Sequence, residues 1–153
     1  MVYFPEKMSQ NGGESVLYGE YRQAIDGKGR ISIPAKMRES LGEVFMIARG
    51  FKNNVYLYPM KEWLSFEDAI AAKDLPTQMR LGLYFYSSAE EASLDAHGRV
   101  TIAQKFRQES GFDKTIVIIG NRTHIELWRE DEWDAYLASI NPDDIMSELM
   151  SSK

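Results

Sequence analysis

Cysteine is absent from the 153-residue sequence, which excludes disulfide bonds and thiolate metal sites and makes a reducing cytoplasm the simplest setting. The sequence also lacks any apolar run near the roughly 20 residues that cross a bilayer, so we expect no membrane partner. Its first fifteen residues have neither the basic start nor the continuous apolar stretch of a signal peptide. We therefore expect residues 1–15 to form a flexible N-terminal arm.

Residues that carry catalytic or metal chemistry are also scarce. The only two histidines, His97 and His124, lie in different predicted elements, and neither belongs to a metal-ligand spacing or a nucleophile and base arrangement. The acidic runs at 90–91 and 130–132 are more typical of solvated strand residues and helix starts than of a general acid and base pair. The sequence therefore predicts no catalytic residue, metal site, cofactor or small-molecule substrate.

Charge is unevenly distributed along a chain whose net charge is −5. Residues 26–42 carry +2 and residues 95–111 carry +1, so the rest of the chain carries −8. Much of that negative charge lies in residues 123–153, which carry −6. An acidic protein is at first sight a poor partner for nucleic acid, but basic charge concentrated in two segments is the pattern of an electrostatic contact surface.

The two basic segments are copies of each other. DGKGRISIPAKMRESLG, residues 26–42, returns 69 positions later as DAHGRVTIAQKFRQESG, residues 95–111. After one inserted residue the offset becomes 70, and Gly50 then aligns with Gly120. The similarity therefore covers about forty residues per copy. We interpret this as two copies of one supersecondary unit, each unable to bury its apolar face alone.

Each copy begins with a tight turn. The carboxylates of Asp26 and Asp95 can accept hydrogen bonds from backbone N–H groups of the turn, and Gly29 and Gly98 supply its positive φ. The RISI and RVTI runs that follow alternate with the period of a half-buried strand, with serine or threonine facing away from the apolar side chains. In the first copy, residues 34–42 suit a short helix that opens at a proline and ends at a left-handed glycine.

Further strands and helices complete each copy. Two strands are predicted after each basic helix, at residues 44–49 and 55–59 and at residues 114–120 and 124–128. Apolar residues at helical spacing predict amphipathic helices at 60–70, 133–140 and 145–150, whereas residues 77–86 fit a helix or the start of a strand. The predicted fold class is α+β, a pseudo-two-fold pair of strand units with short helices, plus connecting and C-terminal helices.

The paired turns, each leading through an alternating strand into a short basic helix, resemble the MraZ family of bacterial transcriptional regulators. The resemblance covers the chain from Tyr18 to Ile140, and it is carried by Tyr18–Tyr21, Asp26–Arg30 with Ile33–Lys36, and Asp95–Arg99. The second copy departs from the family pattern, because Ala103 stands where a proline is usual and His97 stands opposite Lys28.

The resemblance implies a fold, an assembly and a target. It implies two AbrB-type swapped-hairpin halves in one chain, association into rings, and binding to short direct repeats upstream of the operon for division and cell-wall synthesis. It assigns the family's DNA-contacting arginine to Arg30 and Arg99. A plain structural alternative is an ion pair of each arginine with Asp26 or Asp95 in its own turn, and the two roles are compatible.

The predicted DNA-binding residues lie in the turns and in the helices that follow them. They are Lys28, Arg30, His97 and Arg99, with Lys36, Arg38, Lys105 and Arg107 as flanking phosphate contacts. The flanking four are equally well explained as solvated helix charges, because residues two apart on a helix face different sides. A neutral histidine at position 97 contributes less charge near pH 7 than a lysine does.

The chain organisation follows from the repeat. We expect the first AbrB-like repeat with its helix at 16–72, a linker helix and the second repeat at 73–140, and an acidic C-terminal helix or tail at 141–153. The predicted function is that of a cytoplasmic, nucleoid-associated regulator whose partners are double-stranded DNA with tandem short repeats and further copies of itself in a ring-like homo-oligomer. An alternative is an antitoxin-type interaction module that binds a protein through residues 141–153.

Overall fold

The computed structural model describes residues 17–151, so the arm expected at residues 1–15 lies outside the described residues. The first repeat contains β1 (Leu17–Ala24), β2 (Arg30–Ser32), α2 (Ala35–Leu41), β3 (Val44–Arg49), β4 (Val55–Pro59) and α3 (Met60–Ala71). After α4 (Leu75–Phe85), the second repeat contains β5 (Glu90–Ser93), β6 (Arg99–Thr101), α5 (Gln104–Ser110), β7 (Thr115–Arg122), β8 (Ile125–Arg129) and α6 (Glu130–Ser139), followed by α7 (Pro142–Met150). Two matching units of strands and helices confirm the predicted α+β fold.

The two repeats exchange strands within one six-stranded antiparallel sheet of order β1-β7-β8-β4-β3-β5. β1 pairs with β7 of the second repeat, from Leu17 opposite Arg122 to Ala24 opposite Thr115. β5 pairs with β3 of the first repeat, and β4 and β8 join the two halves at the centre. Each repeat therefore supplies the edge strand of the other half, which is the swapped arrangement that the resemblance implies. Neither half of the sheet is complete without the other repeat.

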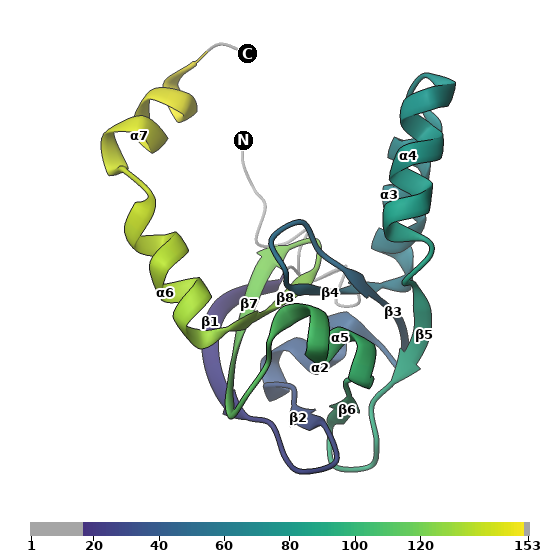
Figure 1. Ribbon diagram of the computed structural model, residues 1–153, viewed down its shortest axis with the longest axis vertical. Helices are drawn as coiled ribbons and strands as arrows, with labels where there is room; N and C mark the ends of the chain where they lie inside the picture. The colour runs from purple at the N-terminus through teal and green to yellow at the C-terminus, as the bar shows by residue number, and fades with distance from the viewer. Residues whose placement is uncertain (1–16, 152–153) are drawn as a thin grey trace, which may run out of the picture.

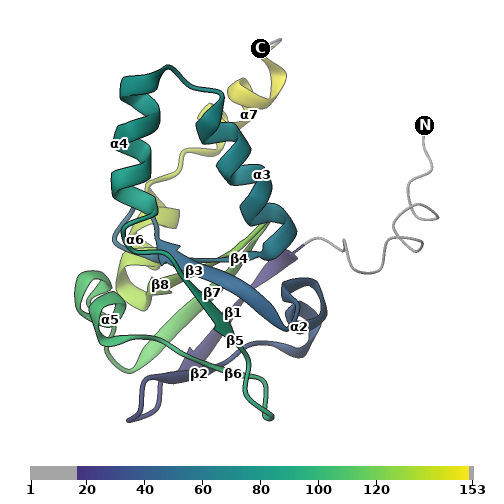
Figure 2. The ribbon, with the colours of Figure 1, turned by 90° about the vertical axis from the view of Figure 1, so that its right-hand side faces the viewer.

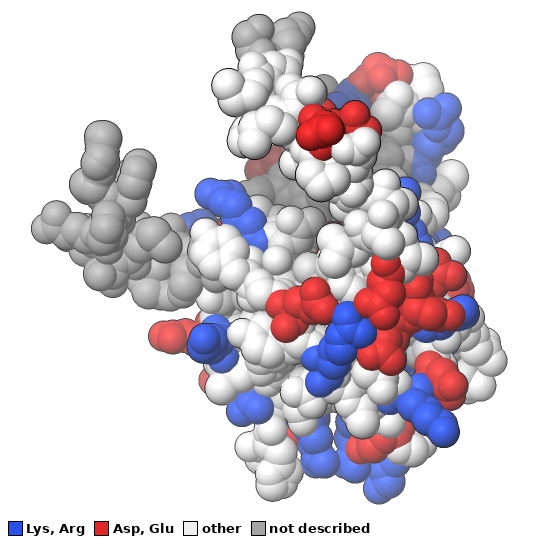
Figure 3. Space-filling view, turned by 90° about the vertical axis from the view of Figure 1, so that its left-hand side faces the viewer, with Lys and Arg blue, Asp and Glu red and all other residues white. Residues whose placement is uncertain are grey.

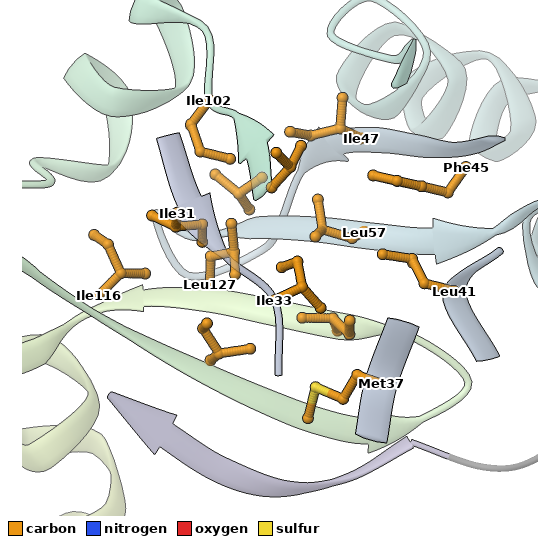
Figure 4. Close-up of a cluster of buried hydrophobic side chains, with 14 of the residues drawn as sticks. Ile31, Ile33, Met37, Leu41, Phe45, Ile47, Leu57, Ile102, Ile116 and Leu127 are labelled. Carbon is orange, nitrogen blue, oxygen red and sulfur yellow. The ribbon is translucent and has the colours of Figure 1, made fainter. Parts of the chain in front are cut away.

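The main apolar core lies between this sheet and the short elements that follow each turn. Ile31, Ile33 and Ile102 are each exposed by 1% or less, and they point toward sheet residues such as Leu57 and Leu127 (Figure 4). Burying one such aliphatic side chain contributes roughly 1.5–3 kcal/mol. The segments at the base of the two turns are therefore fixed to the sheet by side chains from both repeats.

The opposite face of the sheet carries the longer helices. Trp63 and Ile70 of α3 and Phe85 of α4 pack with Tyr56 and Tyr58 of β4, and α6 lies over β7 and β8. In Figure 1, the α3–α4 hairpin and the arm formed by α6 and α7 rise on opposite sides of the molecule, and in both Figure 1 and Figure 2 the two turns project from the other end. None of the helices in the described residues combines the length and the apolar character that a membrane crossing requires.

Helix α4 and the end of helix α2 decide two local expectations. Residues 77–85, which fit a helix or a strand, belong to helix α4, and Tyr86 is its C-cap. The helix has a proline in its first turn and buries Phe85 against α3 and β4. The left-handed helix end expected at Gly42 is wrong, because Gly42 has φ 85° and ψ 175°. Its N–H still donates to Arg38 O at 3.0 Å, and the extended ψ leads the chain directly into β3. Gly111, at the matching position, does adopt the left-handed conformation, with φ 65° and ψ 32°.

Candidate nucleic-acid interface

β2 and β6 form a two-stranded antiparallel ribbon that joins the two turns. Arg30 lies opposite Thr101, and Ser32 lies opposite Arg99. Because side chains alternate along a strand, the middle pair, Ile31 and Val100, faces the core and these four residues share the outer face. Arg30 and Arg99 are diagonal neighbours on that face, and diagonal neighbours in such a pair are about 7–8 Å apart.

The first turn is closed by its aspartate. Oδ1 of Asp26 accepts hydrogen bonds from the backbone N–H groups of Lys28 and Arg30, both at 2.9 Å, and Oδ2 accepts Nε–H of Arg30 at 2.7 Å. The Gly29 N–H donates to Asp26 O at 3.0 Å, and Gly29 has φ +81°, which favours glycine. One carboxylate therefore fixes both the backbone of the turn and one edge of the Arg30 guanidinium.

The second turn repeats this geometry atom for atom. Oδ1 of Asp95 accepts N–H groups of His97 and Arg99 at 2.8 and 2.9 Å, and Oδ2 accepts Nε–H of Arg99 at 2.9 Å. Gly98 has φ +76°. The change from lysine to histidine between the copies therefore alters the charge at the tip and leaves the backbone of the turn unchanged.

These hydrogen bonds keep both carboxylates ionised. The backbone N–H and the guanidinium of Arg30, with the backbone N–H of Lys28, lower the pKa of Asp26 to about 2. The pKa of Asp95 is lowered by the corresponding groups, the Arg99 backbone N–H first. At neutral pH each arginine is thus held through Nε by a charged partner.

The remaining guanidinium donors of the two turns have no partner in the part of the chain that the structure describes. Within residues 17–151, Nη1 and Nη2 of Arg30 and Arg99 make no hydrogen bond, and each side chain is 29% exposed. A guanidinium held at Nε presents the two Nη groups as a fixed fork, the geometry that suits guanine O6 and N7 or a phosphate. Ion pair and DNA contact are therefore compatible roles for the same arginine.

Arg38 and Arg107 each pack against the turn of the other repeat. Nε of Arg38 donates to Ile33 O at 2.7 Å, and a Cβ added to Gly98 would lie 2.2 Å from Arg38 Cζ. In the same way, Nε of Arg107 donates to the carbonyl oxygen of residue 102 at 2.9 Å, and a Cβ added to Gly29 would lie 2.9 Å from that Nε. We call this reciprocal contact the arginine clasp.

The main chain reinforces the clasp. The N–H of Ile33 donates to Gly98 O at 3.0 Å, and the N–H of Ile102 donates to Gly29 O at 2.7 Å. Each turn is consequently bound to the strand end of the opposite repeat. The two arginine-bearing turns form one rigid unit rather than two independent loops.

The other predicted contacts are spread around this unit. Lys28 and His97 are exposed at the tips, and the side chain of neither has a partner among the described residues. Lys36 on α2 is also exposed, whereas Nζ of Lys105 pairs with Glu90 Oε2 at 2.9 Å. The sequence interpretation missed Ser32 and Thr101, which share the outer face of the ribbon with the two arginines; the alternation of the strands is the signal that identifies them.

Charge separates along the molecule. In Figure 3, several lysine and arginine side chains lie at the lower end, where the turns project, with a few carboxylates between them, and the largest group of carboxylates lies higher on the flank. The acidic residues of α6 are Glu130, Asp131, Glu132 and Asp134. The largest acidic cluster therefore lies apart from the end that bears the turns, which favours an anionic partner at that end.

A buried polar cluster lies on the helix-covered face, away from the ribbon. Nε2 of His124 lies 2.9 Å from Glu126 Oε2, and the imidazole packs against the rings of Tyr56 and Tyr58 at centroid distances of 4.7 Å. Burial opposes ionisation of Glu126, but hydrogen bonds from His124, Asn121 and Trp128 outweigh it and lower the pKa of Glu126. No group of three or more potential ligands that could hold a metal ion occurs within residues 17–151.

Comparison with known proteins identifies the family to which this chain belongs. The sequence model of the family described as "MraZ protein, putative antitoxin-like" matches residues 16–80 and 85–148. Transcriptional regulator MraZ of Clostridium tetani is 39% identical over 140 residues, which are 88% of this chain and 99% of that protein. The protein of the same name from Acetivibrio thermocellus is 35% identical over 131 residues, which are 82% of this chain and 90% of that protein. The one from Alkaliphilus oremlandii is 39% identical over 136 residues, which are 86% of this chain and 91% of that protein. Since the two matched segments coincide with the two strand-exchanging repeats, this chain belongs to the MraZ family.

Proposed function

We propose that this protein is a transcriptional regulator that binds double-stranded DNA with the β2–β6 ribbon and its two turns. One observation, made twice, carries the proposal: in each turn an aspartate holds its arginine through Nε and leaves both Nη groups without a partner in the described residues. The curated relatives are named for the regulation of transcription and not for a reaction, and we assign this chain no catalytic activity.

The ribbon enters the major groove, which is wide enough for a two-stranded β-ribbon. The forked Nη groups of Arg30 and Arg99 bind guanine O6 and N7, at about 1–3 kcal/mol of discrimination for each good contact. Ser32 and Thr101 lie beside them on the same face. Lys28, His97 and Lys36 contact flanking phosphates, and the Arg38 and Arg107 clasp sets the position of one turn relative to the other.

A single subunit has too few cations for tight binding. Neutralising two or three phosphates gives a salt slope of about −2 to −3 and, for non-specific contacts, a Kd on the order of 10⁻⁴ to 10⁻⁶ M. Linking several subunits raises the avidity by about 10² to 10⁴ when the spacing of the sites matches that of the subunits. We therefore propose a ring-like homo-oligomer that reads tandem short repeats upstream of the division and cell-wall operon and works in the cytoplasm, at the nucleoid.

The test is binding to tandem-repeat promoter DNA, measured as a function of salt for Arg30→Ala, Arg99→Ala and the double substitution. Each single substitution is expected to weaken binding about 5- to 150-fold, the equivalent of about 1–3 kcal/mol. Arg122→Ala is the matched control, because Arg122 is an exposed arginine at the end of β7 and far from the ribbon in sequence. Unchanged affinity and salt slope in the double substitution would refute the proposal.

A further inference from the structure

Helix α7 stands apart from the rest of the molecule. Every residue of Pro142–Met150 is exposed, including four large apolar side chains. These are Ile145 at 48%, Met146 at 57%, Leu149 at 74% and Met150 at 74% exposure. An isolated helix shorter than about 12–15 residues is marginal in water. A nine-residue helix with such an apolar side therefore needs a surface to pack on.

A second unpartnered apolar face lies on α4. Leu75, Met79 and Leu83 are 64%, 60% and 73% exposed, and they recur every four residues, so they form one row along the helix. On the other side of α4, Phe85 is 1% exposed and packs into the cluster with α3. The apolar residues of α7 also recur at a spacing of four, which allows the row of one helix to pack into the groove beside the row of the other.

The charges beside the two rows have opposite sign. The charged residues of α7 are all acidic, namely Asp143, Asp144 and Glu148. The one charged residue within α4 is Arg80, which adjoins Met79 of the apolar row. Contact between the helices therefore brings an arginine to a helix that carries only carboxylates.

The arrangement of the two helices favours contact between copies. In both Figure 1 and Figure 2, α7 and the α3–α4 hairpin lie at the end of the long axis opposite the turns, and Figure 1 shows them on opposite sides of the molecule. A rotation about an axis along this direction brings α7 of one chain beside α4 of the next. Because the two surfaces differ, the contact repeats from copy to copy and closes into a ring when the rotation is right. All turns then remain at one end of the assembly.

We propose that α7 of each subunit docks on α4 of the next subunit, with the two apolar rows in contact and Arg80 beside the carboxylates of α7. This inference rests on the ring-like homo-oligomer of the proposed function and names the surfaces that hold it together. Each subunit uses both of its exposed helical faces, once as the donor of α7 and once as its acceptor.

Two complementary variants test the inference. Leu83→Asp removes the docking face and Leu149→Asp removes the docking helix, and the mass of each is measured in solution by light scattering. Each variant alone is expected to lose the oligomer. Mixed in equal amounts, they retain one intact pair of surfaces, α7 of the first and α4 of the second, so the mixture is expected to form dimers and nothing larger. Val44→Asp, at a side chain 46% exposed on β3, is the matched control and is expected to keep the parent mass.

Other occupants of α7 give other masses. If α7 packs on α4 of its own chain or on a different protein, neither variant changes the mass, and the inference is overturned. If α7 pairs with α7, Leu83→Asp keeps the parent mass, which also overturns it. The inference is also overturned if the unsubstituted chain is a monomer in solution. Circular dichroism checks the fold of each variant. Binding to a single DNA repeat is measured separately, because it needs Arg30 and Arg99 but no assembly. Failure of the docking contact is then distinguishable from failure of the DNA proposal.

Discussion

Replacing Gly29 by alanine is expected to destabilise the protein, whereas the same change at Gly27 in the same turn is not. A Cβ at Gly29 would lie 2.9 Å from Arg107 Nε and 3.0 Å from Ile102 O, on a backbone with φ +81°. A side chain in that backbone region costs about 1–2 kcal/mol. Weakening the hydrogen bond from the Ile102 N–H to Gly29 O, now 2.7 Å, costs about 1 kcal/mol more.

The free energy of unfolding is thus expected to fall by about 2–3 kcal/mol, which for a chain of this length lowers Tm by about 4–12 °C. At Gly27, nothing lies within 4 Å of an added Cβ and φ is not positive. Gly27→Ala is therefore expected to be neutral or to stabilise by up to about 1 kcal/mol, because alanine reduces the entropy of the unfolded chain.

Thermal unfolding followed by circular dichroism, at one protein concentration for all variants, measures the difference. A double-mutant cycle with Arg107→Ala separates the clasp from the backbone, since removing the arginine relieves only the contact with its side chain. Equal Tm values for the two alanine variants would show that Gly29 is under no constraint. Effects of Gly29→Ala and Arg107→Ala that add within about 0.3–0.5 kcal/mol would show that the clasp does not exist in solution.

Three further predictions concern the turns and their charges. Asp26→Asn and Asp95→Asn are expected to weaken DNA binding in fluorescence anisotropy although each removes a negative charge, because they release the arginine; tighter binding would contradict the role of the carboxylates. The pKa of Asp26 is about 2 in the folded protein, against an ordinary value of 3.8. The contribution of this carboxylate to stability is therefore complete above about pH 4 and is lost as the pH falls through 2. Carbon chemical shifts of the carboxyl group measure its pKa, and a midpoint near 4 would contradict the prediction. Lys28→Ala should make the salt slope of DNA binding shallower by about 1. Lys105→Ala should leave the slope unchanged, because Lys105 pairs with Glu90. Equal slopes in the two variants would contradict the phosphate contact proposed for Lys28.

Local rules in the sequence were enough to predict the turns and the two short strands that follow them, but not the pairing of those strands into a ribbon. The Asp-x-x-Gly pattern requires only contacts within five residues, and the alternation of RISI and RVTI follows from strand geometry alone. The helix over 60–70 has a clear apolar period and forms as α3. Residues 77–86 were ambiguous because Met79, Leu83 and Tyr86 have helical spacing, whereas the run LYFY is typical of a strand. Burial of Phe85 against another element decides between them.

Contacts between the repeats could not be predicted from local patterns. The pairing of β1 with β7 and of β5 with β3 depends on which copy supplies each edge strand, and the resemblance to a family, rather than any periodicity, implied it. Arg38 and Arg107 were predicted to be flanking phosphate contacts or solvated helix charges, and nothing in their local sequence indicated the contacts with glycines about 60 and 78 positions away that the structure shows. Such reciprocal contacts come from the three-dimensional pairing of the copies.

The unlike tips of the ribbon give each subunit a sense of direction. Two identical chains related by a two-fold axis read a sequence equally well from either side, and they suit operators with inverted half-sites. Here the related halves share one chain and have diverged, with a lysine at position 28 of one and a histidine at position 97 of the other. Such a reader distinguishes the upstream side of a site from its downstream side, and a row of these readers is matched to sites that all point the same way.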